Sequence, residues 1–240
     1  MRNPTVSLVI CAYNEEKYIG ACLDYAIKNG KRNLCEIIVI DNASTDRTEE
    51  IASARKGVRV VREEKKGLTR ARQRGYEEAK GDIIAFTDAD TLMPPNWTET
   101  ILDEFKKDTE LAVLSGPYVY YDVPKRDQFL VRLYWYLLAM PVYWLVGYMA
   151  IGGNFAIKKT VLEKMNGFDT TIEFYGEDTD IARRASAFGR SKFKPDFIIY
   201  TSGRRLENTG IFSVAFTYVV NFLSEVLFHK PASKDYRDIR

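Results

Sequence analysis

The stretch GDIIAFTDADTL, residues 81–92, joins an apolar run to two aspartates, Asp88 and Asp90, at the point where the run ends. Its short, β-branched composition predicts a buried strand over 82–88. Similar runs precede it in the chain: TVSLVIC (5–11), EIIVID (36–41) and VRVVR (58–62). Between them, apolar residues recur at helical spacing in segments that end at Gly30, Gly57 and Gly81. This alternation predicts an α/β fold with a mainly parallel sheet flanked by helices.

Composition narrows the class of protein. The 240 residues are 46% apolar, enough to bury a core as one domain or two small ones. Lys and Arg number 35 against 33 Asp and Glu, a net charge of +2 that does not indicate nucleic acid binding. Three cysteines without metal-ligand spacing indicate a reducing compartment. The apolar stretch near the N-terminus is too short for a signal peptide, so we expect a cytoplasmic protein.

Polar and acidic residues follow the predicted strands. In open parallel sheets, ligands bind beyond the carboxyl ends of the strands, so residues at these ends are expected to share one rim. A glycine-rich phosphate loop is missing after the first run, which argues against a Rossmann dehydrogenase or a P-loop kinase. Asp41 could equally be a turn residue before a helix cap. The rim residues are Ala12, Tyr13 and Glu15 after the first strand, Asp41 after the second, and Asp88 and Asp90 after the fourth.

Asp88 and Asp90 are candidate metal ligands. Carboxylates at positions i and i+2 of an extended chain point to the same side, so the two can share one hard cation. Mg²⁺ or Mn²⁺ held by two carboxylates keeps coordination positions for phosphate oxygens of a nucleoside diphosphate. A lone Asp-x-Asp is more often a turn or cap, and the residues alone leave that alternative open.

Taken together, four stretches resemble the family 2 glycosyltransferases, inverting enzymes with the nucleotide-sugar-binding fold called GT-A. The resemblance covers roughly residues 5 to 200 and rests on the joint order of the motifs. It implies transfer of a sugar from a UDP- or GDP-activated donor, or a dTDP-activated one, to an acceptor hydroxyl or phosphate, with Mn²⁺ or Mg²⁺ as cofactor. The stretches are VSLVICAYNEEKYI (6–19), IIVIDNASTDRT (37–48), GLTRARQRGYEEAKGDIIAFTDAD (67–90) and GEDTDIARR (176–184).

The resemblance also implies roles for the rim residues. Ala12, Tyr13 and Glu15 look like base and ribose contacts. Asp41 looks like the partner of the imide of the base, and Arg72 like a nucleotide-side contact. Asp88 and Asp90 look like the ribose and metal-diphosphate ligands.

Inverting transfer requires a base that stands across the sugar from the metal. Glu177 and Asp178 stand at the start of a segment with helical spacing. Acidic residues are common in the first turn of a helix because the helix dipole stabilises their charge, and the same dipole lowers the pKa of a carboxyl group there. The resemblance implies that Asp178 is the general base and that Glu177 contacts or positions the acceptor. It also implies that the stretch AIGGNFAIKK (150–159) lines the acceptor side, where Gly152 and Gly153 allow close backbone approach and Asn154 contacts donor sugar or acceptor.

The stretch LYWYLLAMPVYWLVGYMAI, Leu133 to Ile151, has 19 residues without a charge. Its length suits a membrane span, but a span would place Asp88 and Asp178 on opposite sides of the bilayer. We therefore expect a buried core, a homodimer surface, or peripheral contact with the inner face of the membrane. Pro141 is expected to kink or split a helix there. The expected domains are a GT-A domain over 1–210, with halves 1–115 and 116–210, and an apolar helix with a basic tail over 211–240.

Arg204 and Arg205 fall in a stretch that is typical of a loop. Adjacent arginines can clamp phosphate oxygens of a donor or of a lipid-phosphate acceptor, although a solvated basic loop would look the same. His229 is expected to lie at the surface, which leaves a third metal ligand unassigned. Two other functions stay open: a non-catalytic nucleotide-sugar or lipid-binding module, and a sugar nucleotidyltransferase, which is disfavoured by the acidic loop after the first strand. The acceptor is expected to be a saccharide or a lipid-linked molecule.

Overall fold

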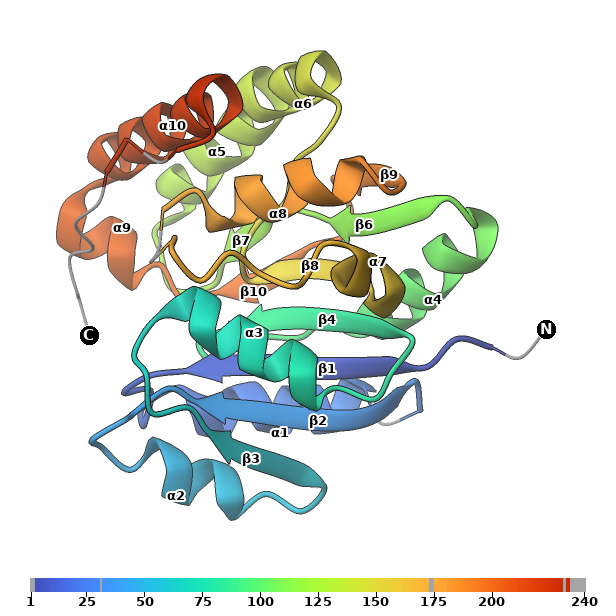
Figure 1. Cartoon of the computed structure of the whole chain (residues 1–240). Coiled ribbons are helices and arrows are strands. Elements are labelled where there is room, and N and C mark those ends of the chain that lie inside the picture. Colours follow the sequence, from blue (N-terminus) through green and yellow to red (C-terminus); the bar gives the residue numbers. More distant parts are fainter. Residues whose placement is uncertain (1–2, 31, 173–174, 231, 234–240) are drawn as a thin grey trace.

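The computed structural model describes residues 3–30, 32–172, 175–230 and 232–233. Within them, the strands form a seven-stranded sheet in the order β3-β2-β1-β4-β8-β6-β9 and a three-stranded sheet in the order β5-β10-β7. Strands β1 to β4 are parallel, and β8 runs antiparallel to both of its neighbours. The fold class is therefore confirmed as α/β with a mainly parallel sheet (Figure 1).

The first half of the chain follows the predicted alternation. The four predicted strands are present, and their ends agree with the prediction to within two residues. The second helix ends at Ser53, earlier than the Gly57 at which its pattern stops. The elements are β1 (Val6–Ala12), α1 (Ile19–Gly30), β2 (Leu34–Asp41), α2 (Thr48–Ser53), β3 (Val58–Arg62), α3 (Leu68–Glu78), β4 (Ile83–Asp88), β5 (Thr91–Leu92) and α4 (Trp97–Lys107).

The second half adds strands to both sheets and several helices. Because β8 is inserted between β4 and β6, residues from both expected halves of the GT-A domain share one sheet. The predicted loop at Arg204 and Arg205 is wrong, since both residues open a short helix, α9. The elements are β6 (Leu111–Ser115), β7 (Tyr118–Tyr120), α5 (Lys125–Tyr134), the π-helix η1 (Trp135–Ala139), α6 (Met140–Val146), β8 (Asn154–Lys158), α7 (Lys159–Lys164), α8 (Glu177–Ser186), β9 (Arg190–Phe193), β10 (Ile199–Thr201), α9 (Arg204–Thr209) and α10 (Ile211–Phe228).

The large sheet has a hydrophobic cluster on each face. Alternate residues of β1 point to opposite faces: Leu8 packs in the cluster with α1 and α4, whereas Val9 packs in the cluster with α3, α7 and α8. Helices therefore cover both faces, and the polar ends of the strands stay accessible at one edge. Along that edge the register pairs Cys11 with Asp88 and Ala12 with Asp41, which brings the predicted rim residues together.

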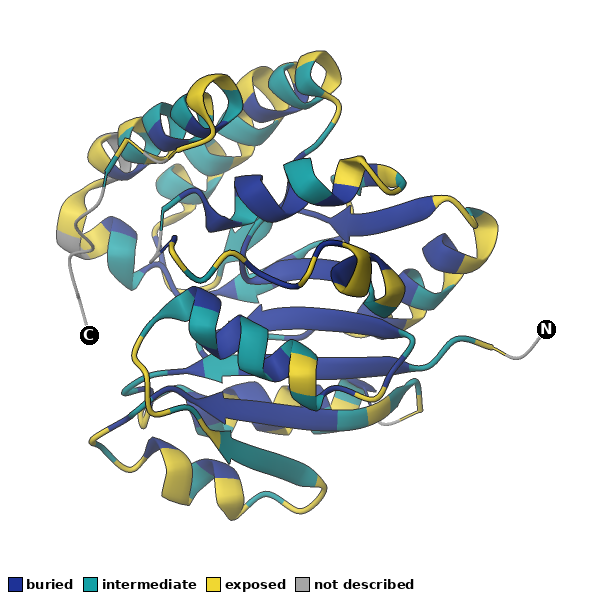
Figure 2. Ribbon diagram, viewed as in Figure 1, coloured by how far each residue is buried: buried dark blue, intermediate teal, exposed yellow. Residues whose placement is uncertain are grey.

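The uncharged segment Leu133 to Ile151 is mainly helical but is not a buried core. Its π-helical turn η1 ends just before α6, in which Pro141 stands at the start; this is the predicted local disturbance, because proline lacks the N–H that an α-helix needs there. In the part of the chain that the structure describes, one helix, Lys125–Val146, is long and apolar enough to cross a membrane, and 17% of its most apolar window is buried. Helices α5, α6 and α10 lie together at one end of the molecule and carry many exposed residues (Figure 2). Part of the predicted basic tail, 234–240, lies outside the described residues.

Close packing of α3 on β1 gives a stability prediction. A Cβ at Gly75 would collide with Val9 of β1, so Gly75→Ala should lower the free energy of unfolding by about 1–3 kcal/mol through overpacking. Gly20→Ala is the matched control, because its methyl would meet the end of the Arg55 side chain, which can move. The control should stabilise by about 0.5–1 kcal/mol, as replacement of a helical glycine does. Urea unfolding followed by circular dichroism measures both, and an unchanged midpoint for Gly75→Ala would contradict the packing argument.

Candidate active site

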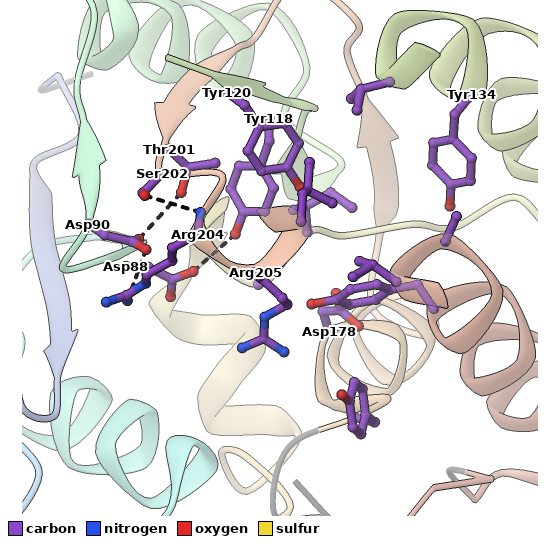
Figure 3. A pocket seen from close by; sticks show the side chains of 18 of the residues that line it. Asp88, Asp90, Tyr118, Tyr120, Tyr134, Asp178, Thr201, Ser202, Arg204 and Arg205 are labelled. Carbon is purple, nitrogen blue, oxygen red and sulfur yellow. Dashed lines mark hydrogen bonds and ion pairs between the residues drawn. The ribbon is translucent and has the colours of Figure 1, made fainter. Parts of the chain in front are cut away.

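A cavity of about 540 Å³ opens beyond the carboxyl ends of β1 and β4 (Figure 3). Its lining comes from the loops after these strands, from β7 and β10, and from α5, η1, α8, α9 and α10. Asp88 and Asp90 line it together with Glu177 and Asp178, although nearly ninety residues separate the two pairs in sequence. The cavity thus unites the two acidic motifs that the sequence singled out.

Asp88, the last residue of β4, is held in a short hydrogen-bond chain. The Tyr118 hydroxyl donates to Asp88 Oδ2 at 3.0 Å and accepts from the Gly153 N–H at 2.7 Å. A Cβ at position 153 would collide with both the Asp88 carboxylate and the Tyr118 hydroxyl, so the expected close approach at this glycine is present. Sequence reasoning missed Tyr118; the available signal was the tyrosine-rich stretch YVYY (118–121).

Asp90 does not lie in extended chain, as the sequence argument assumed, but in the turn between β4 and β5. Its side chain is 12% exposed and is contacted from elsewhere: Arg204 Nη2 lies 3.0 Å from Oδ2, and the Thr201 hydroxyl lies 3.3 Å from Oδ1. Burial raises the pKa of Asp90 to about 7, and the charge of Arg204 opposes that rise. Asp88 and Asp90 nevertheless line the same cavity, as Figure 3 shows.

Arg204, at the start of α9, ties the donor-side loops together. It contacts both oxygens of Glu15, at 2.9 and 2.6 Å, and also Asp90. Its guanidinium carbon stands 4.7 Å from the centre of the Tyr18 ring. Because Glu15 is buried, this bidentate pairing compensates a carboxylate that would otherwise be costly to bury.

Arg72, on α3, connects the donor side to the predicted base. Its side chain is 2% exposed, and Nη1 lies 3.0 Å from Glu177 Oε1, while Nη2 lies 3.9 Å from Asp88 Oδ1. A Cβ at Gly152 would collide with the Arg72 guanidinium, so a glycine is required in this turn before β8. Arg72 is therefore placed between the two acidic pairs.

Glu177 and Asp178 open α8, as the spacing predicted. The Thr179 N–H donates to Asp178 Oδ1 at 2.8 Å. The expected lowering of the Asp178 pKa by the helix dipole is outweighed: burial raises its pKa, against the charge of Arg72 and the backbone N–H donors of Thr179 and Gly152. Burial and the charge of Asp178 likewise raise the pKa of Glu177, against Arg72. A carboxylate with a raised pKa is a better proton acceptor.

The remaining donor-side residues lie along the same edge. Tyr13 lines the cavity, and Lys66 Nζ stands 3.9 Å from the centre of its ring. Ala12 is buried at the end of β1. Asp41 is fully buried; its Oδ2 accepts a hydrogen bond from Arg62 at 2.7 Å, whereas within the described residues its Oδ1 has no hydrogen-bond partner. A buried carboxylate oxygen without a partner is a candidate acceptor for a ligand N–H.

The predicted contact of Asn154 with donor or acceptor does not fit the structure. Its amide is fully buried and already satisfied: Oδ1 accepts from Trp97 Nε1 at 2.9 Å, and Nδ2 donates to the carbonyls of Gly116 and Phe197 at 3.0 and 2.7 Å. Asn154 therefore joins β8 to the neighbouring strands and loops as a structural residue. Arg205, in contrast, lines the cavity as predicted, and His229 is exposed.

The ligand set suits a hard divalent cation at an open site. No group of three or more His, Cys, Asp or Glu side chains among the described residues is arranged to hold a metal. The cavity offers the two carboxylates of Asp88 and Asp90, whose oxygens are the ligands that Mg²⁺ and Mn²⁺ prefer, with further positions left for ligand phosphates.

Comparisons with known proteins agree with this geometry. A glycosyltransferase of Streptococcus pneumoniae, GlyG, is 34% identical over 123 residues, which are 49% of this chain and 40% of the relative. A glucosyl-dolichyl phosphate glucuronosyltransferase of Haloferax volcanii is 25% identical over 190 residues, 72% of this chain and 58% of the relative. The chain thus spans less than two thirds of the length of these curated relatives.

Solved structures show the same fold. Glucosyl-3-phosphoglycerate synthase from Mycobacterium tuberculosis, solved with Mn²⁺, UDP-glucose and phosphoglyceric acid, superposes with a TM-score of 0.67 at 21% identity and covers 96% of this chain and 81% of its own. This likeness confirms the GT-A fold. The family model for glycosyl transferase family 2 matches residues 7–165, more than half of the chain. The resemblance carried by the sequence motifs is thereby confirmed, and the chain belongs to glycosyl transferase family 2.

Proposed function

We propose that the protein is an inverting glycosyltransferase that moves a sugar from a nucleoside diphosphate sugar to a hydroxyl or phosphate of a saccharide or lipid-linked acceptor. The observation that carries the proposal is the meeting of Asp88, Asp90 and Asp178 in one cavity, with candidate diphosphate ligands on one side and a candidate base on the other. The names of the relatives, which include a UDP-glucose-bound synthase and a glucuronosyltransferase, support the donor class.

The donor nucleotide is assigned to the edge formed by β1 and β2. Tyr13 offers a ring to the base. Asp41, which is buried and is not part of the cavity lining, has an Oδ1 that could accept from the imide N–H of uracil or the N1–H of guanine. Ala12 and Glu15 stand near the expected base and ribose, and Arg72 stands where its charge faces the diphosphate side of the cavity. This edge therefore fits a nucleoside diphosphate sugar whose base carries a ring N–H, such as a UDP, dTDP or GDP sugar.

A divalent cation is assigned to Asp90 and Asp88. Both carboxylates offer hard oxygen ligands in the same cavity. The synthase of similar fold was solved with Mn²⁺ and UDP-glucose. When bound, the cation would neutralise charge on the departing diphosphate as a Lewis acid. Arg204 adds positive charge on the same side, where it can pair with phosphate oxygens.

The transfer step uses Asp178 as base. The acceptor oxygen forms a bond to the anomeric carbon on the face opposite the diphosphate, the carbon–oxygen bond to the diphosphate breaks, and the diphosphate leaves with the electron pair. The proton of an acceptor hydroxyl passes to Asp178, whose pKa is raised by burial. Glu177 positions this helix end through its contact with Arg72.

We also propose that α5, α6 and α10 rest on a membrane surface. Large apolar side chains of these helices are exposed, among them Trp144 at 72% and Leu145 at 87%, which is more than a monomer in water usually gathers on one face. Exposed Lys125, Arg126 and Arg132 on α5 add positive charge that suits anionic headgroups.

Donor and metal binding can be measured by thermal unfolding with UDP or GDP and with Mn²⁺, Mg²⁺ or EDTA. A ligand at a hundred times its dissociation constant adds about 2.7 kcal/mol, or roughly 5–10 °C for a chain of this size. We expect one nucleotide to produce this shift only with metal, and Asp90→Ala to abolish the metal-dependent part. Asp196→Ala, at a side chain 74% exposed outside the cavity, is the control. A shift that survives in Asp90→Ala would remove Asp90 as a metal ligand.

Catalysis can be separated from binding with Asp178→Asn. Loss of a general base should lower kcat by about 10² to 10⁴-fold, while the dissociation constant of the nucleotide stays within about threefold. Asp103→Asn, at an exposed position of α4, should leave both unchanged. Steady-state assays of nucleotide release, with sugar derivatives of the nucleotide that passes the thermal test, give kcat. Undiminished turnover in Asp178→Asn would exclude Asp178 as the base, and undetectable turnover in the unaltered protein would favour a binding module.

Membrane contact predicts co-sedimentation with phosphatidylglycerol vesicles at low salt. Leu145→Asp should reduce the bound fraction severalfold, because it puts a charge into the apolar surface. Tyr25→Asp alters a residue of α1 that is 45% exposed on another part of the molecule, and it should bind like the unaltered protein. Full recovery of the unaltered protein in the supernatant would overturn this part of the proposal.

A further inference from the structure

The cavity has two ends of different chemistry. One end carries the acidic residues and Arg204, whereas the other is walled by aliphatic side chains of α5, η1 and α10. We call this second end the apolar arm: Leu130, Val131, Leu133, Leu137, Leu138 and Val214. In the view of Figure 3, Tyr134 of α5 lies on this side of Asp178 and the Asp88–Asp90 pair on the other. The residues assigned to the donor and the base leave the arm without a role.

Three leucines of the apolar arm are also exposed. Leu133, Leu137 and Leu138 line the cavity and are at the same time 42%, 68% and 44% exposed. They belong to the same run of helix as Trp144 and Leu145, which form the proposed membrane-facing surface. The interior of the cavity is therefore continuous with that surface through aliphatic side chains.

A positive charge lies near the candidate base, on the side away from the arm (Figure 3). Arg205 lines the cavity, and in Figure 3 its guanidinium projects into the space between Asp88 and Asp178. Burial raises the pKa of the Tyr120 hydroxyl, and the charge of Arg205, which lines the same cavity, opposes that rise. A phosphate at this point would have Arg205 as a partner on the acidic side of Asp178.

We infer that the apolar arm binds the hydrocarbon chain of a lipid-linked acceptor, with the linking phosphate at Arg205 and the reacting hydroxyl at Asp178. This rests on the proposed function, because it takes Asp178 as the site of transfer. The chain would enter from the membrane beside Leu137, whose side chain both lines the cavity and is exposed.

The side chains of the arm favour this occupant over the alternatives. A free saccharide would press its hydroxyls against leucines and a valine, where they would lose hydrogen bonds to water without replacement. A second copy of the protein would cover Trp144 and Leu145, but it would not account for aliphatic residues that continue inward to the base. A hydrocarbon chain matches both the outer surface and the interior.

The test measures how affinity depends on chain length. Dodecyl phosphate, butyl phosphate and inorganic phosphate are titrated calorimetrically as monomers, below the micelle concentration, into the protein loaded with the nucleotide and metal that pass the thermal test. Each buried methylene should tighten binding about fourfold, so we expect dodecyl phosphate to bind at least about 100-fold more tightly than butyl phosphate. Equal affinities for the two would overturn the inference.

Variants locate the binding site. Leu137→Asp should weaken dodecyl phosphate at least tenfold, whereas Leu145→Asp, on the same run of helix but outside the cavity, should change it less than twofold. Both positions are well exposed, so both variants should fold. Arg205→Gln should weaken dodecyl phosphate about tenfold but leave the uncharged probe dodecyl maltoside unchanged. If Leu137→Asp and Leu145→Asp weaken binding equally, the hydrocarbon chain binds on the outer surface, and its assignment to the apolar arm is overturned.

The outcomes separate this inference from the proposed function. Nucleotide binding that depends on metal, together with no preference for the longer chain, would overturn the lipid arm and leave the transferase proposal standing. Chain-length-dependent binding to the protein without added nucleotide, together with no nucleotide binding, would support the arm and overturn the donor site. A dimer that dissociates in Leu145→Asp, as seen by size-exclusion chromatography with light scattering, would assign the outer surface to a second copy and overturn entry from a membrane.

Discussion

A buried ion pair between Arg72 and Glu177 holds the two sides of the candidate active site in register. Arg72 belongs to α3, whose helix packs on the nucleotide-side strands, and Glu177 is the first residue of α8, which carries Asp178. Both side chains are nearly inaccessible, at 2% and 9% exposed, so neither charge can be satisfied by water. Loss of one partner from such a pair costs several kcal/mol of folding free energy. The pair also packs so closely on Gly152 that a side chain at that position would collide with the Arg72 guanidinium. The ion pair thereby fixes the position of the start of α8, and of Asp178, relative to α3.

The same burial gives the carboxylates of the cavity different properties. Asp88 is still 37% exposed and accepts a hydrogen bond from Tyr118, whereas burial raises the pKa of Asp178 and raises that of Asp90 to about 7. A raised pKa suits a group that takes up a proton, whereas a cation at Asp90 would have to compete with the proton that burial favours there. The second sheet contributes to the acidic end, since β7 supplies Tyr118 to Asp88 and β10 supplies Thr201 to Asp90.

Sequence reasoning recovered the elements whose patterns are local. The strands β1 to β4 are β-branched and nearly continuous in apolar residues, and Asp88 and Asp178 were found because recognisable motifs surround them. Asn154 was misassigned because its amide is engaged by Trp97 and Phe197, residues far away in the chain that only tertiary structure brings together. Tyr118 was missed because β7 is three residues long, too short to show alternation. Arg204 was placed in a loop because a helix of six residues has little periodicity to detect.

Arg204 gives the acidic end an internal counter-ion. Its guanidinium stands 3.0 Å from Asp90, and its two terminal nitrogens donate to the two carboxylate oxygens of Glu15. The charge of these carboxylates is therefore partly neutralised within the protein. A divalent cation that binds Asp90 would therefore have to displace Arg204. Its apparent affinity would be the difference between the affinity of Asp90 for the cation and its affinity for the arginine. The metal ion alone would then bind weakly. A metal ion bound to a diphosphate would bind more tightly, because the displaced arginine could pair with the phosphate oxygens. The order in which metal and diphosphate bind would then depend on the side chain of Arg204.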